Sequence, residues 1–357
     1  MKIGIIGLPK TGKKTLFELL TNHKPTEAEL TANKPIIAIA EIKDSRFDKL
    51  CKIYKPKKER RARIDIEMLP DLEKDTITKG DIFTDIKELD AICHVVRAFQ
   101  DDSIYHVEGS VDPSRDINLI NSELILHDLM FIEKRLERIE GRAQKIKDET
   151  VLREKELLVK LKAHLDKELP LRLLKIDDEE KKIISSYPFI TLKEMLVALN
   201  ISESDLKDTS LIDKLKGIYK EVKMDFMQVS AKVESEIAKL ESDEDKEEFL
   251  KDLNITEPAI NLLTQLCIKS LNLISFFTVG PDEVRQWTIR AGSRAPEAAR
   301  TIHTDLEKGF IRAEVMKYSD FDTLGSESKV KDAGKLSLKG KDYVVCDGDM
   351  LDIRFNV

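Results

Sequence analysis

The chain opens with a strand, a glycine-containing turn and a helix, and this order constrains the fold more than any other segment. Residues 2–6 (Lys-Ile-Gly-Ile-Ile) form a short apolar run of the length of a buried strand. The turn at 7–12 begins and ends with glycine, and residues 13–21 follow as a helix. Further strand-like runs follow at 36–40, 64–69 and 91–96. Strands that alternate with helices predict an α/β fold with these strands in one sheet.

Length and composition exclude several classes of protein. At about 150 residues per domain, a chain of 357 residues predicts two or three domains. Charged residues make up 36% and hydrophobic residues 41% of the chain, which excludes wholesale disorder. A formal net charge of -7 excludes a bulk polycation, so any contact with nucleic acid needs a local basic patch.

The cysteines and the apolar runs indicate the compartment. The four cysteines lie far apart and form no Cys-x-x-Cys pair, which gives no support for disulfides or a zinc site. No run reaches the ~18 apolar residues of a membrane helix. We therefore expect a cytoplasmic protein with no membrane partner.

A strongly charged segment interrupts the α/β pattern. From 133 to 182, 28 of 50 residues are charged, with the two signs interspersed. Two apolar stripes with helical spacing run beneath these charges, formed by Leu129, Ile132, Leu136, Ile139, Ala143 and Ile146, and then by Leu158, Leu161 and Leu165. The pattern predicts an antiparallel coiled-coil hairpin with a polar turn around Asp148.

Strand patterning returns after the hairpin. Residues 188–200 and 226–230 are predicted as strands, and a charged helical stretch runs from about 233 to 272. Short strands and turns then predict a small α+β domain at 274–357.

The first turn has the composition of a phosphate-binding loop. Gly7 and Gly12 allow backbone N–H groups to face phosphate, and Lys13 supplies a positive charge at the start of a helix. The next position needs a Ser or Thr hydroxyl for Mg²⁺, but it holds Lys14, and Thr15 comes one place late. Glycine pairs of this kind also occur in ordinary strand–helix turns.

Several blocks of sequence resemble the YchF / Obg-like ATPase family. Residues 7–17 (Gly-Leu-Pro-Lys-Thr-Gly-Lys-Lys-Thr-Leu-Phe) resemble its opening G-L-P-N-V-G-K-S-T-L-F. More specific are residues 101–113, which contain His-Val-Glu-Gly, and residues 276–280 and 309–315 near the end of the chain. The resemblance implies a P-loop NTPase domain at 1–127 and 184–273, a coiled-coil hairpin inserted at 128–183, and a C-terminal β-grasp (TGS) domain at 274–357.

The resemblance also implies a nucleotide site for ATP, or for GTP. The family's adenine-preferring motif N-x-x-E falls on residues 200–203, and its Ser-Ala-Lys loop falls on 230–232. An Asn that ends a strand and caps a helix is the competing interpretation of Asn200. The implied nucleotide-binding residues are Gly7, Lys10, Thr11, Gly12, Lys13, Lys14, Thr15, Asn200, Ile201, Glu203, Ser230 and Ala231.

Three positions linked to magnesium depart from the family pattern. Lys14 replaces the hydroxyl, Met68-Leu69-Pro70-Asp71 replaces the segment D-x-A-G, and the expected switch Thr falls on Ala32 or Thr31. A shorter charged stretch at 73–80 replaces a glycine-rich segment. We therefore assign no catalytic or metal-binding residue. We expect nucleotide binding that depends little on Mg²⁺, weak discrimination between ATP and ADP, and hydrolysis close to background.

The densest basic patch lies between residues 52 and 63. It is a candidate RNA-contacting surface, and a solvated loop is the alternative. The six histidines show no metal-binding spacing, and His94 is interpreted as a core residue whose polar atoms are satisfied. The candidate RNA-binding residues are Lys55, Lys57, Lys58, Arg60 and Arg61.

The leading hypothesis is a divergent YchF-like nucleotide-binding protein that acts as a monomeric switch on the ribosome or on RNA. The alternative is a pseudo-NTPase scaffold that binds RNA or ribosomal protein through the hairpin and the TGS domain, without functional nucleotide binding. A small-molecule kinase is less favoured, because no acceptor-substrate lid follows the phosphate loop.

Overall fold

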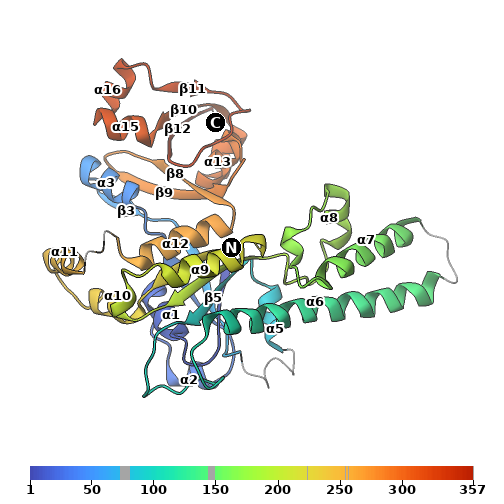
Figure 1. The fold of residues 1–357 in the computed structure, drawn as a ribbon. Coiled ribbons are helices and arrows are strands. Elements are labelled where there is room, and N and C mark those ends of the chain that lie inside the picture. The colour runs from blue at the N-terminus through green and yellow to red at the C-terminus, as the bar shows by residue number, and fades with distance from the viewer. Residues whose placement is uncertain (73–80, 144–148, 223, 254, 256, 357) are drawn as a thin grey trace. The chain divides into compact units, whose positions relative to one another are not determined.

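The computed structural model describes residues 1–72, 81–143, 149–222, 224–253, 255 and 257–356 (Figure 1). It divides the chain into two compact units, each made of two segments. The first unit comprises Met1–Ala38 and Asp65–Leu263, and the second comprises Ile39–Ile64 and Thr264–Val357. No helix in the described ranges is both long and apolar enough to cross a membrane.

A six-stranded sheet organises the first unit. Its strands run in the order β2 (Ile36–Glu41), β4 (Arg63–Met68), β1 (Lys2–Ile6), β5 (Ala91–Arg97), β6 (Glu194–Asn200) and β7 (Asp225–Val229). β1 pairs in parallel with β4 and β5, and β6 pairs in parallel with β5 and β7. The predicted strands at 36–40, 64–69, 91–96 and 226–230 are therefore confirmed.

Helices cover this sheet because their apolar stripes need a partner surface. Ile117 and Ile120 on one helix, and Ile212 on another, pack in one buried cluster with Val96 and Leu199 of the sheet. The helices that follow the sheet strands are α1 (Lys13–Thr21), α2 (Glu27–Thr31), α5 (Asp81–Lys87), α6 (Pro113–Ala143), α7 (Glu149–Leu165), α8 (Asp178–Ile184), α9 (Ser210–Ile218), α10 (Ala231–Ile237), α11 (Asp243–Asp252) and α12 (Ala259–Ser270). The predicted helical stretch from 233 to 272 is thus divided into three helices.

The helices α6 and α7 run side by side (Figure 1). Residues of both share one buried cluster, in which Ile132 and Ile139 of α6 meet Leu158 and Leu161 of α7. Ion pairs cross between them at Glu133–Lys162 (2.8 Å), Arg135–Glu154 (2.5 Å) and Glu140–Lys155 (2.9 Å). Residues early in α6 pair with residues late in α7, so the two helices are antiparallel. The expected turn around Asp148 lies outside the described residues.

The helix α6 begins well before the expected start of the hairpin at residue 128. Its first half contributes Ile117, Ile120 and Leu124 to the core of the sheet, and from Ile125 onward its buried residues join the hairpin cluster. One continuous helix therefore serves two cores. The change from one core to the other falls close to the boundary expected from composition.

A second six-stranded sheet organises the second unit. Its strands run in the order β11 (Ser337–Lys339), β10 (Phe310–Lys317), β12 (Asp349–Phe355), β8 (Leu273–Thr278), β9 (Glu283–Arg290) and β3 (Lys58–Arg60). Its helices are α3 (Ser45–Tyr54), α13 (Ala295–Ile302), α14 (Thr304–Lys308), α15 (Tyr318–Leu324) and α16 (Glu327–Asp332). It is a mixed sheet, since β10 pairs antiparallel with β12 and β12 pairs in parallel with β8.

Most of residues 39–64 pack with the C-terminal residues and not with the rest of the segment predicted as a nucleotide-binding domain at 1–127. Phe47 and Leu50 of α3 pack in one buried cluster with Phe277 and Phe321. The strand β3 also extends the second sheet by pairing in parallel with β9. Shared core and shared backbone hydrogen bonds place this segment with the C-terminal residues, and the second unit resumes at Thr264 rather than at 274.

Asp128 ties α6 to the loop before β6. The carboxylate is fully buried and accepts hydrogen bonds from Ile190 N (3.0 Å), Thr191 N (2.8 Å) and Thr191 Oγ1 (2.7 Å). Because these N–H groups bond to a side chain, residues 188–193 form a loop and the strand begins at Glu194. The strand predicted at 188–200 is therefore wrong in its first part.

Replacing Asp128 with Ala removes the acceptor for two buried backbone N–H groups. We expect the free energy of unfolding to fall by about 3 kcal/mol, because each buried unsatisfied donor costs ~1–3 kcal/mol. Chemical denaturation measures the change, and Glu137→Ala, at an exposed position of the same helix, is the matched control. Equal stabilities of the two variants contradict this account of the loop.

Candidate functional site

The carboxyl ends of β1, β5, β6 and β7 meet at one edge of the first sheet. β1 lies between β4 and β5, so the strand order reverses there as the chain moves from one side of β1 to the other. Parallel sheets bind ligands at such switch points, outside the carboxyl ends of the strands. The loop at 7–12 leaves β1 at this point and leads directly into α1.

Both glycines of this loop are required, because a side chain at either position would collide with neighbouring atoms. Gly12 has φ of 91°, and a Cβ there would overlap the side-chain nitrogen of Asn200. A Cβ at Gly7 would lie 2.6 Å from Val95 O and 3.0 Å from Thr11 Oγ1. Only glycine allows the loop to approach β5 and Asn200 this closely.

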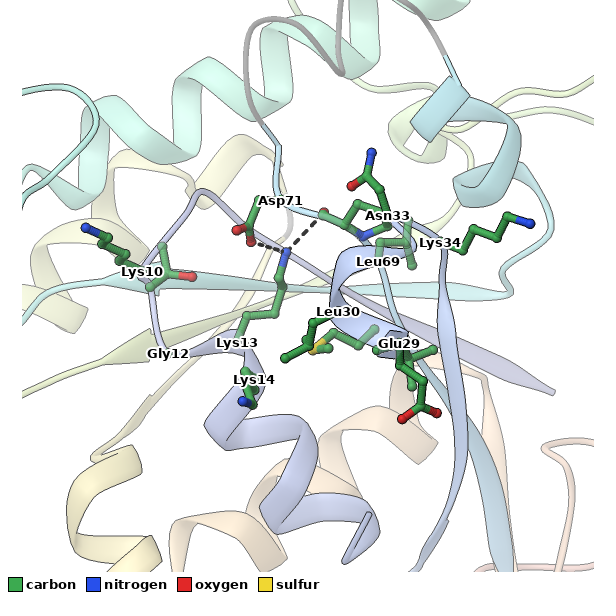
Figure 2. A pocket seen from close by; sticks show the side chains of 14 residues that line it. Lys10, Gly12, Lys13, Lys14, Glu29, Leu30, Asn33, Lys34, Leu69 and Asp71 are labelled. Atoms are coloured by element: carbon green, nitrogen blue, oxygen red, sulfur yellow. Dashed lines mark hydrogen bonds and ion pairs between the residues drawn. The ribbon is translucent and has the colours of Figure 1, made fainter. Parts of the chain in front are cut away.

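Lys13 is held at the centre of the loop. Its side chain is 7% exposed, and its ammonium contacts Asp71 Oδ1 (2.8 Å), Pro70 O (3.0 Å) and Gly7 O (3.5 Å). Figure 2 shows Lys13 directed from α1 toward Asp71. Beneath it, burial and the nearby charge of Lys13 lower the pKa of His94 to about 3, so this imidazole is neutral at pH 7.

His94 differs in one respect from the prediction. It lies in the core, in β5, as expected. However, neither ring nitrogen has a hydrogen-bond partner among the described residues, so its polar atoms are not satisfied by the protein. A neutral imidazole adds no charge to compete with Lys13 for an anion.

A cavity of about 460 Å³ opens beside Lys13. It is lined by residues 10–14 of the loop, by residues of and after α2 such as Glu29 and Asn33, and by residues 68–71 (Figure 2). The sequence motif placed Lys13 here, but it gave no sign that Asp71 faces it. Charged side chains and the N-terminus of α1 make this cavity suited to phosphate groups.

The groups around this cavity do not fit Mg²⁺ as a P-loop holds it. Mg²⁺ requires oxygen ligands in near-octahedral geometry. Lys14 is half exposed and its ammonium lies 3.9 Å from Glu18, and Figure 2 shows it directed away from Lys13. Met68 offers a thioether, and the hydroxyl of Thr31 donates to Glu27 O within α2. Lys14 lines the same cavity as Lys13 but offers no oxygen ligand.

A second cavity of about 900 Å³ opens on the other side of the loop. It is lined by Lys10, Gly12 and Thr15, by residues 99–104 after β5, by residues 200–204 after β6 and by one face of α10. Three loops and a helix that lie far apart in the sequence thus line this cavity as one wall. Its volume is in the range of pockets that hold small organic ligands.

Asn200 joins the loops that form this wall. Its buried amide donates from Nδ2 to Thr11 O (3.0 Å) and accepts at Oδ1 from Ala231 N (3.0 Å). The structure agrees in part with both interpretations of Asn200. The residue ends a strand, as the structural interpretation expects, and it also borders the cavity, as the nucleotide-binding interpretation expects. Its amide oxygen bonds to the start of α10 and its amide nitrogen to the phosphate loop.

The remaining predicted residues either line the second cavity or hold the lining residues in place. Ile201, Glu203 and Ala231 line the second cavity, and Glu203 lies 3.6 Å from the ammonium of Lys232. Ser230 is buried behind the wall, where its hydroxyl accepts from Val233 N at the start of α10. Gly7 and Ser230 therefore shape the site without lining it.

Sequence reasoning missed the loop that follows β5. Buried Arg97 donates to Phe99 O (3.2 Å), Asp101 O (3.1 Å) and Ile104 O (2.9 Å), and its guanidinium lies 4.6 Å from the centre of the Phe99 ring. These bonds hold residues 99–104 along the second cavity. The family-like block at 101–113 covers part of this loop, but it gave no sign that Arg97 orients it.

The candidate RNA-binding residues lie in the second unit. Lys57 pairs with Asp282 (2.8 Å), and Arg61 pairs with Asp48 and lies 4.8 Å from the Phe47 ring centre. Lys55, Lys58 and Arg60 are exposed, and no ion pair is formed by them within the described part of the chain. Two of the five candidate RNA-binding side chains are therefore already paired with carboxylates of the protein.

Comparison with known proteins covers the whole chain. Residues 273–356 match the family YchF-GTPase_C, described as "Protein of unknown function (DUF933)". "Ribosome-binding ATPase YchF" of Bacillus subtilis (strain 168) is 40% identical over 364 residues, covering 99% of each chain. The protein of the same name in Escherichia coli O157:H7 is 38% identical over 363 residues, covering 100% of this chain and 99% of that one.

Solved structures agree. "Structure of the Schizosaccharomyces pombe YchF GTPase" superposes with a TM-score of 0.82 at 32% identity, covering 99% of this chain and 97% of that chain. A GTP binding protein from Pyrococcus horikoshii OT3 has the same fold at 21% identity, with a TM-score of 0.59 over both whole chains. These matches confirm the predicted fold class, a P-loop NTPase domain with a C-terminal domain. Over its whole length, the chain belongs to the YchF family.

Proposed function

We propose that this protein is a cytoplasmic, ribosome-associated nucleotide-binding protein that prefers ATP to GTP and hydrolyses nucleotide slowly or not at all. The observation that carries the proposal is the bridge made by Asn200 between the phosphate loop and the start of α10. This bridge joins the cavity beside Lys13 and the larger cavity into one site that can hold phosphates and a base. The relatives, which are named ribosome-binding ATPases, support ATP binding and association with the ribosome.

The phosphate half of the proposed site uses charge and backbone dipoles. The positive end of the α1 helix dipole lies at the loop, and Lys13 provides a buried positive charge. Both favour an anion in the cavity beside residues 10–14. Because Lys14 and Met68 supply no oxygen ligand where a P-loop supports Mg²⁺, we expect charge neutralisation in this site to come mainly from the protein.

The base half of the proposed site is assigned to adenine. Guanine presents two neighbouring donors, and guanine-selective sites meet them with a carboxylate that is free to accept. The carboxylate of Glu203 already has the ammonium of Lys232 at 3.6 Å. This contact joins two largely exposed side chains and leaves Glu203 able to accept hydrogen bonds, so the preference for ATP over GTP rests on the resemblance of residues 200–203 to the family's N-x-x-E motif.

One observation favours the alternative of a scaffold without nucleotide binding. Lys13 already has a carboxylate partner in Asp71 (2.8 Å), and it needs no phosphate to balance its charge. Direct binding measurements on the full chain separate this alternative from the proposed function.

Replacing Asn200 with Ala leaves Thr11 O and Ala231 N, both in the site wall, without their partner. We expect affinity for ATP to fall about tenfold, the effect of losing ~1.4 kcal/mol, and the unmodified protein to bind ATP more tightly than GTP. Isothermal titration calorimetry measures both, with Asn121→Ala on α6 as the control. A preference for GTP in the unmodified protein contradicts the assignment of residues 200–203.

The residues at the three altered magnesium-linked positions predict how nucleotide binding and hydrolysis depend on Mg²⁺. Removing Mg²⁺ with EDTA should change nucleotide affinity little, and ATP hydrolysis should stay at background. Lys14→Ser supplies one hydroxyl ligand, so it should make binding more dependent on metal without restoring turnover, because Met68 and Asp71 remain. Rapid Mg²⁺-dependent hydrolysis by the unmodified protein, absent from Lys13→Ala, overturns this prediction.

The exposed basic residues predict how ribosome binding depends on salt. We expect co-sedimentation with ribosomes to weaken as salt rises, because phosphate contacts release counterions. Replacing Lys55, Lys58 and Arg60 with Gln should lower the slope of log K against log salt by roughly 0.7–0.9 for each phosphate that the protein no longer neutralises. Gln at the exposed Lys329, Lys331 and Lys341 is the control of equal charge. Binding that both triple variants retain equally excludes this patch.

A further inference from the structure

Asp71 is held in place against the lysine of the phosphate loop. It lies between two buried leucines, Leu69 and Leu72. Leu69 N donates to Ile5 O (3.0 Å) and Leu72 N donates to Gly7 O (3.1 Å), so both sides of Asp71 are tied to β1 and the loop. The contact of its carboxylate with Lys13 Nζ at 2.8 Å is therefore built into the backbone path.

The Asp71 carboxylate lies where it competes with a bound phosphate for the ammonium of Lys13. The lysine of a P-loop contacts the oxygens of the second and third phosphates. Here two of the three ammonium donors of Lys13 already reach Asp71 (2.8 Å) and Pro70 O (3.0 Å), and the contact to Gly7 O is the longest at 3.5 Å. The Gly7 contact is the one that a phosphate oxygen replaces most readily, while Asp71 keeps its share of the charge.

A third phosphate meets repulsion that a second phosphate escapes. A triphosphate brings one more phosphate group and one more negative charge than a diphosphate toward the same cavity. Lys13 is buried but the Asp71 side chain is about half exposed, so the repulsion between its carboxylate and a third phosphate is only partly screened. Lys14 and Met68 offer no oxygen ligand at two positions where a P-loop supports Mg²⁺, so a metal held in the usual P-loop manner does not offset this repulsion.

We propose that Asp71 takes the place of a terminal phosphate beside Lys13, and that the site therefore selects nucleoside diphosphates over triphosphates. The inference rests on the proposed function, since it assumes that an adenine nucleotide binds. It replaces the weak discrimination between ATP and ADP expected from the sequence by a definite preference for ADP. It also gives Asp71 a role in specificity, whereas the sequence comparison treated position 71 only as the loss of the family's glycine.

Calorimetric titration of the full chain with ADP and with ATP, each with EDTA and with Mg²⁺, tests the proposal. We expect ADP to bind about tenfold more tightly than ATP, the effect of ~1.4 kcal/mol of partly screened repulsion. Asp71→Asn keeps the shape and removes the charge, so the preference should fall below about threefold through a gain in ATP affinity. Asp71→Gly is the second variant, and Glu27→Gln, exposed in α2 and outside the described cavity lining, is the matched control.

The outcomes separate this inference from the proposed function. Equal or tighter binding of ATP by the unmodified protein overturns the inference and leaves nucleotide binding intact. A preference for ADP that survives in folded Asp71→Asn, with thermal unfolding as the check on folding, also overturns it. Failure of the unmodified protein and of both Asp71 variants to bind either nucleotide overturns the proposed function and the inference together.

Discussion

The geometry of the candidate site depends on one buried amide. Asn200 stands at the end of β6 and bonds at once to the phosphate loop and to the start of α10. Its closeness is also the reason that position 12 has to be glycine, since any side chain there would overlap the amide. The conformation of the loop, the position of α10 and the wall of the larger cavity therefore follow from two hydrogen bonds. A buried amide with both ends satisfied is rigid, because breaking either bond leaves a second buried group unpaired.

The phosphate half of the site is organised around a charge that the protein balances by itself. In a metal-dependent P-loop, a hydroxyl, an acidic residue and a glycine surround the phosphates together with Mg²⁺. Here a lysine, a methionine and an aspartate occupy those three positions, and the aspartate contacts Lys13. The three changes are consistent with one another. In the proposed site, the Asp71 carboxylate supplies negative charge next to Lys13 that a terminal phosphate would otherwise supply.

The two units show how segments distant in the chain become one core. The segment 39–64 contributes the helix α3 and the strand β3 to the C-terminal sheet, although it is flanked on both sides by strands of the first sheet. Likewise, α6 begins in the core of the first sheet and ends in the core of the hairpin. In both cases the buried apolar residues, rather than order along the chain, decide which unit a segment joins.

The sequence alone determined the features that depend on local pattern: the strand, glycine turn and helix at the start, the antiparallel helical pair, and most strands of the first sheet. Through blocks that resemble a family, it also indicated candidate residues for a nucleotide site, several of which line the two cavities. Only the tertiary structure decided that residues 39–64 join the C-terminal sheet, that residues 188–193 form a loop on Asp128, and that Asp71 faces Lys13. Residues 13 and 71 are separated in the chain by β2, β3 and β4, and no periodicity or motif relates them. Their contact exists because the parallel pairing of β1 with β4 brings the ends of both strands to the same edge of the sheet.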